Sequence, residues 1–242
     1  KVGENFGSIV GPDFQRNEKG DILIDPQTGL PQYDKSNHVL GNASWDWTGG
    51  LLTNFTYKNI SLVAVFDVKV GADLYSMSAR AAYESGKSPE TLAGRDAWYR
   101  SEEERLAAGI AKGADNWKPT GGFVAPGVID NGDGTYRPND IYINPEDYWM
   151  SVCRNAPSMF IYDNSYVKCR ELTLSYNVPK SWLKNVVSGL TVSFVARNPF
   201  IVWKNIPNID PDSNYNNTTG MGLEYGSLPS RRSYGFNVNV KF

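Results

Sequence analysis

The sequence is poor in the residues that most catalytic and metal sites use. Its 242 residues include one histidine, His38, and two cysteines, Cys153 and Cys169. One imidazole excludes a multi-histidine metal site and restricts any Ser-His-Asp triad to His38. Two cysteines are too few for a disulfide framework or a four-cysteine zinc site, although a single disulfide between them stays open. We therefore expect no catalytic residue, no metal and no cofactor.

A basic excess and long apolar runs are also absent. Lys plus Arg total 24 and Asp plus Glu total 26, which argues against a nucleic-acid partner. No apolar run approaches 18 residues, so we expect no transmembrane helix, whereas the strands of a membrane barrel leave only a weak hydropathy signal. The chain begins at Lys1 without an initiator Met or an apolar leader, which predicts a processed or incomplete chain.

Strand signals are abundant. Aromatic residues make up 13% of the chain and there are 23 glycines, which favours strands and turns. Residues 233–242 alternate without a fault between apolar and polar side chains, and this period of two predicts a two-faced strand. The same alternation predicts further strands in 48–57, 61–70, 166–177 and 190–197, and a poorer one in 5–14. The apolar face of such strands suits either a soluble sandwich core or membrane lipid.

One predicted strand is irregular. In 166–177, Leu172, Leu174 and Tyr176 define an apolar face, but continuing that face backwards meets Arg170 and Lys168. Either a β-bulge shifts the phase there, or that end of the strand rises above the apolar belt.

The predicted connections alternate between short and long. The turn at 57–59 and the segment that begins at 179 are short, whereas about 15–46, 76–160 and 199–232 are long. Outer-membrane barrels have short periplasmic turns and long outer loops, while loops of this length are uncommon in compact soluble domains. We expect helix inside 76–160, starting near Ser88 and again at a capping box at Ser101, with Gly109 or Gly113 at its end.

Acidic clusters give no clear site. Asp210 and Asp212, or the acids at 102–104, are conceivable glycosidase pairs, but turn formers and solvated helix starts are far commoner. The acidic run 130–140 lacks the spacing of an EF-hand loop, so a solvated turn is favoured over calcium binding, which is left open.

Four stretches in order resemble the SusC/RagA family of TonB-dependent outer-membrane nutrient transporters. Residues 47–59 resemble its "WTGG…FTYK" hairpin, and 165–183 resemble a strand and the turn that follows it. Residues 196–200 resemble "ARNLF", and 209–212 resemble the following "DPE". The resemblance covers roughly residues 3–242. The chain departs from the family pattern at Cys169 and Pro199, where Leu is usual.

The resemblance implies an all-β fold that is part of a transmembrane antiparallel barrel. The family has a 22-stranded barrel with an N-terminal plug, so residues 1–242 would supply about six C-terminal strands, with long extracellular loops, one of them partly helical. Six strands cannot close a barrel, because bacterial single-chain barrels have at least 8. We therefore expect the plug, the TonB-contacting segment and the earlier strands to be absent from this chain.

The function implied is active import rather than catalysis. The family takes up oligosaccharides or peptides, with a SusD-like surface lipoprotein as a lid and with power from the TonB complex through the N-terminal part. The implied location is the Gram-negative outer membrane, with lipid around the barrel, a periplasmic C-terminus and extracellular loops. The candidate lumen-facing residues are Thr56, Asp67, Lys69, Asn237, Asn239 and Lys241.

Aromatic residues of the long loops are weaker candidates for ligand or lid contacts, because most such rings pack within loops or lie in membrane-interface girdles. They are Trp98, Trp117, Tyr136, Trp149 and Trp203.

Two other functions remain as alternatives. A soluble secreted β-sandwich with aromatic loops would act as a carbohydrate-binding module. An extracellular hydrolase on a similar scaffold is the weakest hypothesis, because an acid–base pattern is lacking.

Overall fold

The computed structural model describes residues 3–183, 187–213 and 220–242, and the chain divides into two compact units. The first, called the sheet unit, comprises Lys1–Gly7, Asn42–Leu74 and Tyr162–Phe242. The second, called the loop unit, comprises Ser8–Gly41 and Tyr75–Ile161. The long predicted loop over 76–160 is therefore folded, in one compact unit with residues 8–41.

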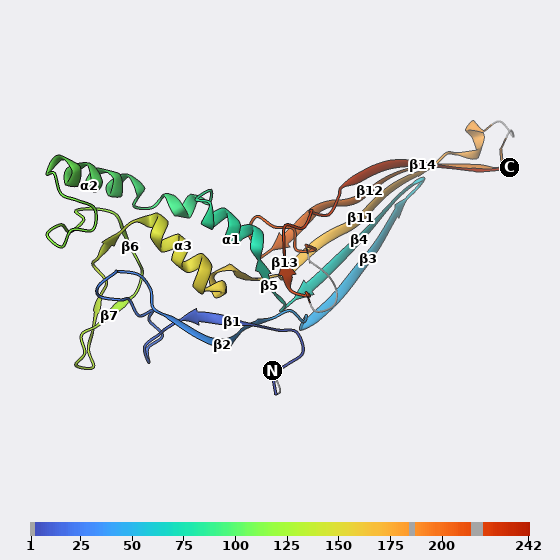
Figure 1. The fold of residues 1–242 in the computed structure, drawn as a ribbon. Helices are drawn as coiled ribbons and strands as arrows, with labels where there is room; N and C mark the ends of the chain where they lie inside the picture. The colour runs from blue at the N-terminus through green and yellow to red at the C-terminus, as the bar shows by residue number, and fades with distance from the viewer. Residues whose placement is uncertain (1–2, 184–186, 214–219) are drawn as a thin grey trace. The chain divides into compact units, whose positions relative to one another are not determined.

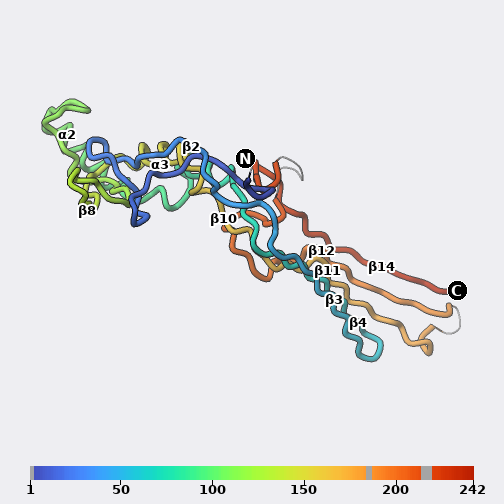
Figure 2. Tube along the Cα trace, turned by 90° about the horizontal axis from the view of Figure 1, so that it is seen from below, coloured from blue at the N-terminus to red at the C-terminus, as the bar shows by residue number. Residues whose placement is uncertain are grey.

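The sheet unit is built on five antiparallel strands in the order β14-β12-β11-β4-β3 (Figure 1). Their bounds are β3 (Trp47–Tyr57), β4 (Ile60–Val70), β11 (Tyr166–Asn177), β12 (Gly189–Lys204) and β14 (Ser233–Lys241). Figure 2 shows these strands side by side along their length. These five strands lie in the sheet in the same order as along the chain, so the sheet is a meander. β3 and β14 form its two outer edges, and the sheet does not close among the described residues.

The strand register creates one apolar face and one polar face, and the polar face also includes Val63, Val65 and Val195. Opposite residues across the sheet share a face because side chains alternate along every strand. One row joins large apolar side chains from all five strands: Phe55, Leu62, Leu174, Phe194 and Phe236. The next row lies on the other face and is polar throughout: Thr56, Ser61, Ser175, Ser193 and Asn237. The alternation read from the sequence is thereby confirmed as a sheet with two chemically distinct faces.

A β-bulge resolves the irregular strand. Cys169 lies opposite Phe66 of β4 and Glu171 lies opposite Val65, so Arg170 is the extra residue. The register with β12 shifts at the same place. Before the bulge the polar face takes Tyr166 and Lys168, and after it the odd-numbered residues of β11 take that face.

The sixth predicted strand lies elsewhere. Residues 5–14 contribute β1 (Ser8–Phe14), which pairs with β2 (Tyr33–Asn42) in a separate two-stranded sheet, and β2 falls in the predicted loop 15–46. Pro12 lacks an amide hydrogen for a sheet ladder, which restricts β1 to an edge position. Five of the six predicted strands therefore form the barrel-like sheet.

The loop unit also contains the helices of the chain's middle. They are α1 (Met77–Glu84), η1 (Pro89–Leu92), α2 (Arg95–Ala107), α3 (Pro145–Asn155) and η2 (Pro157–Phe160). Two short antiparallel pairs accompany them: β6 (Phe123–Val124) with β9 (Tyr142–Ile143), and β7 (Val128–Asp130) with β8 (Tyr136–Pro138). Further short elements are β5 (Asp73–Ser76), β10 (Ile161–Asp163), η3 (Lys180–Trp182) and β13 (Leu223–Glu224). None of the helices in the described part of the chain has the length and hydropathy to cross a membrane.

The predicted helix start at Ser101 is wrong. Ser101 lies in the middle of α2, and its buried hydroxyl accepts a hydrogen bond from the Thr120 amide at 3.0 Å. The helix begins after Gly94, whose φ of +79° is a conformation that glycine adopts without strain. A Cβ at Gly94 would also lie 2.7 Å from the Gly122 backbone. The start is thus set by backbone packing rather than by a side-chain cap.

The other helix signals hold better. Pro89 opens a helical turn after Ser88, although the turn is the short 3-10 helix η1. Gly109 follows the end of α2 with a φ of +68°, and its amide bonds the Leu106 carbonyl. Gly109 is therefore the glycine that ends this helix, and Gly113 lies further along the chain.

The core of the loop unit forms around one face of α3. Tyr148, Trp149, Val152 and Cys153 have the spacing of a single helix face, and all four are buried. The Tyr83 ring of α1 packs 4.8 Å from the ring of Trp149, and the rings of Tyr83 and Phe160 lie 5.5 Å apart between centroids. The N-terminus of α3 is capped by Asn144, whose side chain accepts the amide of Glu146.

Both cysteines are free thiols. Cys153 lies in the loop-unit core, where burial raises its pKa to about 11, and Cys169 lies on β11. The disulfide left open by the sequence is not formed.

We expect Phe160→Ala to loosen the loop unit selectively. Phe160 has no exposed surface, and such truncations cost about 3–5 kcal/mol. In the whole protein, limited trypsin digestion should cut residues 75–161 faster. Met159→Ala is the matched control, because Met159 is 39% exposed and should cost less than about 1 kcal/mol. Equal effects of both changes would contradict the assignment of Phe160 to the core.

Candidate functional site

The six candidate residues of the strands all lie on the polar face of the sheet. Thr56, Asp67 and Lys69 lie on β3 and β4, and Asn237, Asn239 and Lys241 lie on β14. The register connects Thr56 to Asn237 through Ser61, Ser175 and Ser193, which extend the candidate set across the intervening strands.

Hydroxyls of the polar row bond one another. Thr56 Oγ1 lies 3.1 Å from Ser61 Oγ, and Ser175 Oγ lies 2.8 Å from Ser193 Oγ. One row away, the Thr191 hydroxyl donates to Asn177 Oδ1 at 2.7 Å. This part of the polar face is therefore neutral and largely satisfied by its own hydrogen bonds.

A charged cluster occupies one end of the same face. Lys168 Nζ lies 3.2 Å from Asp210 Oδ1 and 2.6 Å from Asp212 Oδ2, although its side chain is only 2% exposed. Arg170 Nη2 lies 2.6 Å from Asp67 Oδ2, and Arg170 Nη1 lies 2.5 Å from Asp212 Oδ2. Asp67 is thus held in an ion pair, whereas Lys69 lies 5.4 Å from the ring centroid of Trp45.

The cluster fixes the segment that follows β12 to the sheet. Asp210 accepts hydrogen bonds from the amide and hydroxyl of Ser230, and the Tyr166 hydroxyl donates to Asp212 at 2.8 Å. The Asn164 amide group donates to the Pro211 carbonyl at 3.0 Å. Asp210 and Asp212 do form a turn, as expected, since Asp210 Oδ1 accepts the Asp212 amide. They are also partners of the buried Lys168 and, for Asp212, of the half-buried Arg170, and sequence spacing gives no signal for that role.

Both loop carboxylates are held in the charged form. Burial acts to raise the pKa of Asp212, but hydrogen bonds from Arg170, Lys168 and Tyr166 outweigh it and hold that pKa well below its usual range. Burial likewise opposes hydrogen bonds from Ser230 and the Asp212 amide at Asp210, whose pKa is lowered. A carboxyl pair held anionic in this way has no group ready to act as a general acid, unlike the pair of a glycosidase.

Three of the five candidate aromatic residues meet in the loop unit. Trp98 of α2 lines two adjoining hollows, Trp149 of α3 lines the smaller one, and Trp117 lines the larger one. Tyr136 of β8 lines neither hollow. Trp203 of β12 belongs to the sheet unit.

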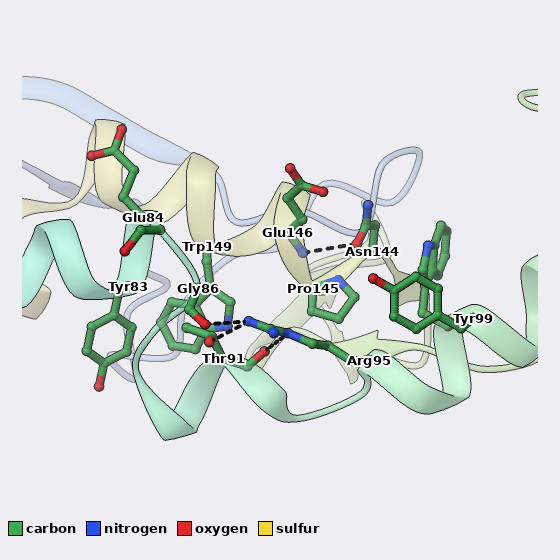
Figure 3. Close-up of a pocket in the computed structure, with 12 residues that line it drawn as sticks. Tyr83, Glu84, Gly86, Thr91, Arg95, Tyr99, Asn144, Pro145, Glu146 and Trp149 are labelled. Carbon is green, nitrogen blue, oxygen red and sulfur yellow. Dashed lines mark hydrogen bonds between the residues drawn. The ribbon is translucent and has the colours of Figure 1, made fainter.

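The smaller hollow, of about 240 Å³, is shown in Figure 3. Arg95 lies in it with its guanidinium bonded to the Gly86 carbonyl at 2.9 Å and to the Thr91 hydroxyl at 2.8 Å. Tyr99 lies to one side of Arg95, and the carboxylates of Glu84 and Glu146 point away from it in this view. Arg95 is thus largely occupied in holding the turn before α2.

The larger hollow, called here the aromatic cleft, has a volume of about 1020 Å³. Its walls come from the turn at 26–30, from α2 and α3, and from the segments at 115–119 and 137–144. Trp98 and Asn144 line both hollows, so the two adjoin there. Among the described residues, no group of three or more His, Cys, Asp or Glu side chains is placed to hold a metal ion.

The carboxylates of the turn at 130–134 accept hydrogen bonds from nearby backbone amides. Asp130 accepts the Gly132 amide at 2.8 Å, and Asp133 accepts the Thr135 amide at 2.9 Å. These bonds make the tight hairpin between β7 and β8, as the turn chemistry indicated.

Comparison with known proteins relates the chain to TonB-dependent receptors. The chain is 33% identical over 213 residues to TonB-dependent receptor P3 of Formosa agariphila, and the match spans 84% of this chain and 17% of the relative. No family model matches the chain. The resemblance to TonB-dependent receptors of the SusC/RagA type is confirmed.

Two solved structures share the fold. The RagAB peptide importer in its closed-closed state matches with a TM-score of 0.57 and 16% identity, over 97% of this chain and 23% of that one. The RagAB peptide transporter matches with a TM-score of 0.55 and 17% identity, over 97% and 22% of the two chains. The strand-rich chain therefore has the fold of part of a TonB-dependent barrel, and it spans less than a quarter of these proteins.

Removing the buried cation should release the segment after β12. Lys168→Met leaves Asp210 without a cation, while Asp212 keeps Arg170, and breaking a buried ion pair costs about 3–5 kcal/mol. Amide hydrogen exchange in 205–213 should show local opening made easier by about that amount. Lys180→Met is the control, because Lys180 lies on η3 beyond the other end of β11. Unchanged protection in Lys168→Met would contradict the anchoring role.

The segment after β12 should stay bound to the sheet in mild acid. A carboxyl group with a lowered pKa contributes stability that is present above its unfolded pKa, about 3.9, and lost as pH falls through the folded value. The Asp212 and Ser230 amides, which donate to Asp210, should stay protected from pH 7 to about pH 5 and lose protection below about pH 4. The Ala156 amide, bonded to a carbonyl, is the internal reference. Loss of protection near pH 6 would count against this account.

Proposed function

We propose that this chain of a SusC/RagA-type TonB-dependent receptor forms part of the barrel of an outer-membrane active importer. The observation that carries the proposal is the exposed apolar face of the five-stranded sheet. Phe55 is 68% exposed and Phe236 is 80% exposed. A soluble sandwich would bury such a face under a second sheet, whereas a membrane barrel turns it towards lipid.

The length of β3 supports a membrane-spanning role. Trp47 and Tyr57 lie at its two ends on the apolar face, paired with Val70 and Ile60. Ten residue steps of about 3.3 Å give about 33 Å along the strand, and a tilt of about 40° reduces this to a height of about 25 Å. That is the height of the apolar band between the two aromatic girdles of outer-membrane barrels.

The opposite face is then the lumen wall. Thr56, Lys69, Asn237, Asn239 and Lys241 would face the water-filled interior with the serine row. Asp67 would lie on the same wall within the charged cluster. The open edges of β3 and β14 would pair with the remaining barrel strands, because unpaired backbone groups are costly in lipid. Those strands, with a plug, would lie on the same or another polypeptide.

The connections suggest an orientation. The β3–β4 turn and the β11–β12 connection join strands at one end of the sheet, where Gly189 pairs with Lys241 near the C-terminus. The long connections leave from the opposite strand ends. By the usual build of these barrels, the short turns and the C-terminus face the periplasm and the long segments face outward.

In this proposal the protein binds and moves a solute rather than converting it. TonB would supply the energy through the plug, a SusD-like surface lipoprotein would cover the outer loops, and the cargo would be an oligosaccharide or a peptide. The occupation of Asp210 and Asp212 by ion pairs supports a non-catalytic role.

Single-cysteine labelling tests the two faces directly. In the whole receptor in outer membranes, Asn237→Cys should react with a charged, water-soluble maleimide, while Phe236→Cys should react only after detergent unfolding. The pair is matched, since the two positions are adjacent on β14 and differ only in face. The native thiols of Cys153 and Cys169 are buried and set a low background. Equal reactivity at both positions, or recovery of the receptor in the soluble fraction, would refute the barrel proposal.

A further inference from the structure

We propose that one end of the five-stranded sheet binds the headgroups of anionic phospholipids. This end, called here the short-turn end, comprises the β3–β4 turn and the described part of the β11–β12 connection, and Figure 1 shows the C-terminus at the same end. The inference rests on the proposed barrel function, which places the short-turn end at the periplasmic surface of the outer membrane. It adds a lipid partner that the import proposal does not require.

Charged residues are distributed unevenly along the sheet. The stretches 47–66, 172–209 and 225–242 contain no aspartate or glutamate, so no acidic side chain lies between Glu171 and the short turns. The cations at this end include Lys58 and Lys180, and neither has an ion-pair partner among the described residues. The short-turn end therefore has positive charge that the sheet itself does not neutralise.

The ammonium group of Lys58 lies against the lipid-facing side of this end. It is 5.3 Å from the centroid of the Tyr57 ring, and Tyr57 belongs to the apolar face. Tyr57 is 62% exposed, so the ring and the ammonium group together form a surface that is apolar on one side and charged on the other. Rings of this kind lie at headgroup level in membranes, where a lysine meets lipid phosphates.

The backbone at Lys58 gives a second reason to look for a partner outside the sheet. Its φ is +52°, in the left-handed region that glycine adopts without strain. Glycine and asparagine are the usual residues at such positions of two-residue hairpin loops. The turn thus has an exposed lysine where glycine would cost less, and the lysine contributes no ion pair to the described chain.

The β11–β12 connection places a second cation beside the first turn. The Asn177 amide donates to the Asn59 carbonyl at 2.8 Å, which fixes the start of this connection next to the β3–β4 turn. Lys180 follows on η3, and Trp182 of the same short helix is 68% exposed. An exposed indole close to a lysine is typical of membrane–water interfaces, where the ring lies among headgroups and the lysine reaches towards phosphate.

The arrangement of the lysines favours a lipid surface over a free anion. Lys58 and Lys180 are exposed and belong to two separate connections at the rim of the sheet. Exposed ammonium groups at a rim suit a layer of headgroups, whereas a small free anion is held by donors that converge on one point. The opposite end of the sheet has that convergent arrangement, because Lys168 and Arg170 both contact Asp212 there.

The test uses the whole receptor in a nonionic detergent, with dioctanoyl phosphatidylglycerol and dioctanoyl phosphatidylcholine as probes. The two lipids have the same acyl chains and differ in headgroup charge. Native mass spectrometry of the lipid-bound states gives the ratio of the two dissociation constants, called here the headgroup preference. We expect phosphatidylglycerol to bind more tightly, and the headgroup preference to fall as salt rises.

Substitutions locate the lipid site. Lys58→Gly and Lys180→Gln should each reduce the headgroup preference about fivefold, the effect of removing one cation near an anionic lipid surface. Lys58→Gly relieves the backbone at the turn, so its effect cannot come from a damaged hairpin. Lys58→Arg keeps the charge and should keep the headgroup preference. Lys87→Gln is the matched control, an exposed lysine of the loop unit, and should leave it unchanged.

Equal binding of the two lipids overturns the inference and assigns these lysines to a soluble anion or an acidic protein. A headgroup preference that both lysine removals leave unchanged overturns it as well. So does displacement of the lipid by inorganic phosphate at matched ionic strength, which would identify a site for the free anion.

The cysteine labelling on β14 tests the barrel separately. Face-selective labelling without a headgroup preference keeps the barrel proposal and rejects the lipid site. Labelling without face selectivity, together with a lysine-dependent headgroup preference, rejects the barrel and keeps the lipid site on a protein that binds the membrane surface.

Discussion

The β-bulge at Arg170 lets one strand meet two different chemical demands. Leu172 and Leu174 of β11 lie on the apolar face of the sheet, yet the preceding residues of the same strand include Lys168 and Arg170. The extra residue changes the phase, so that both cations reach the polar face while the apolar row stays continuous. Without it, two cations would lie among apolar side chains at a cost of several kcal/mol each. The bulge therefore supports both the two-faced sheet and the charged cluster.

The buried cation of Lys168 in turn determines where the loop after β12 lies. Lys168 is almost fully enclosed, and an enclosed charge is tolerated only with partners and hydrogen bonds. Asp210 and Asp212 supply them from a segment more than forty residues along the chain, and they bring Ser230 with them. The loop after β12 is thus held against the sheet by electrostatics and hydrogen bonds, whereas the loop unit is held together by an aromatic and aliphatic core around α3.

Patterns that reflect a repeating environment could be read from the sequence, and contacts between distant segments could not. In a strand whose two faces meet different media, the chemical character of the side chains repeats every two residues. The bounds of β4 and β14 were therefore predictable almost to the residue. Residues 5–14 alternate poorly, and their pairing with β2 depends on tertiary context. Ser101 fits a capping pattern, but the close approach of Gly94 to Gly122 decides where α2 begins. The pairing of Lys168 with Asp212 depends on the three-dimensional fold, and so does the position of Trp98 and Trp117 in one cleft. Local spacing in the sequence carries no signal for either.

The sheet and the loop unit offer a solute very different surfaces. Along the polar row next to the β3–β4 turn, Thr56 bonds Ser61 and Ser175 bonds Ser193, so these hydroxyls already have hydrogen-bond partners within the sheet. Weak binding is what a conducting wall requires, because a solute held tightly there would not move on. The loop unit differs, because the indole N–H groups of Trp117 and Trp149 are buried without an acceptor among the described residues. In the proposed importer, a lumen wall of this kind would let a solute pass without holding it.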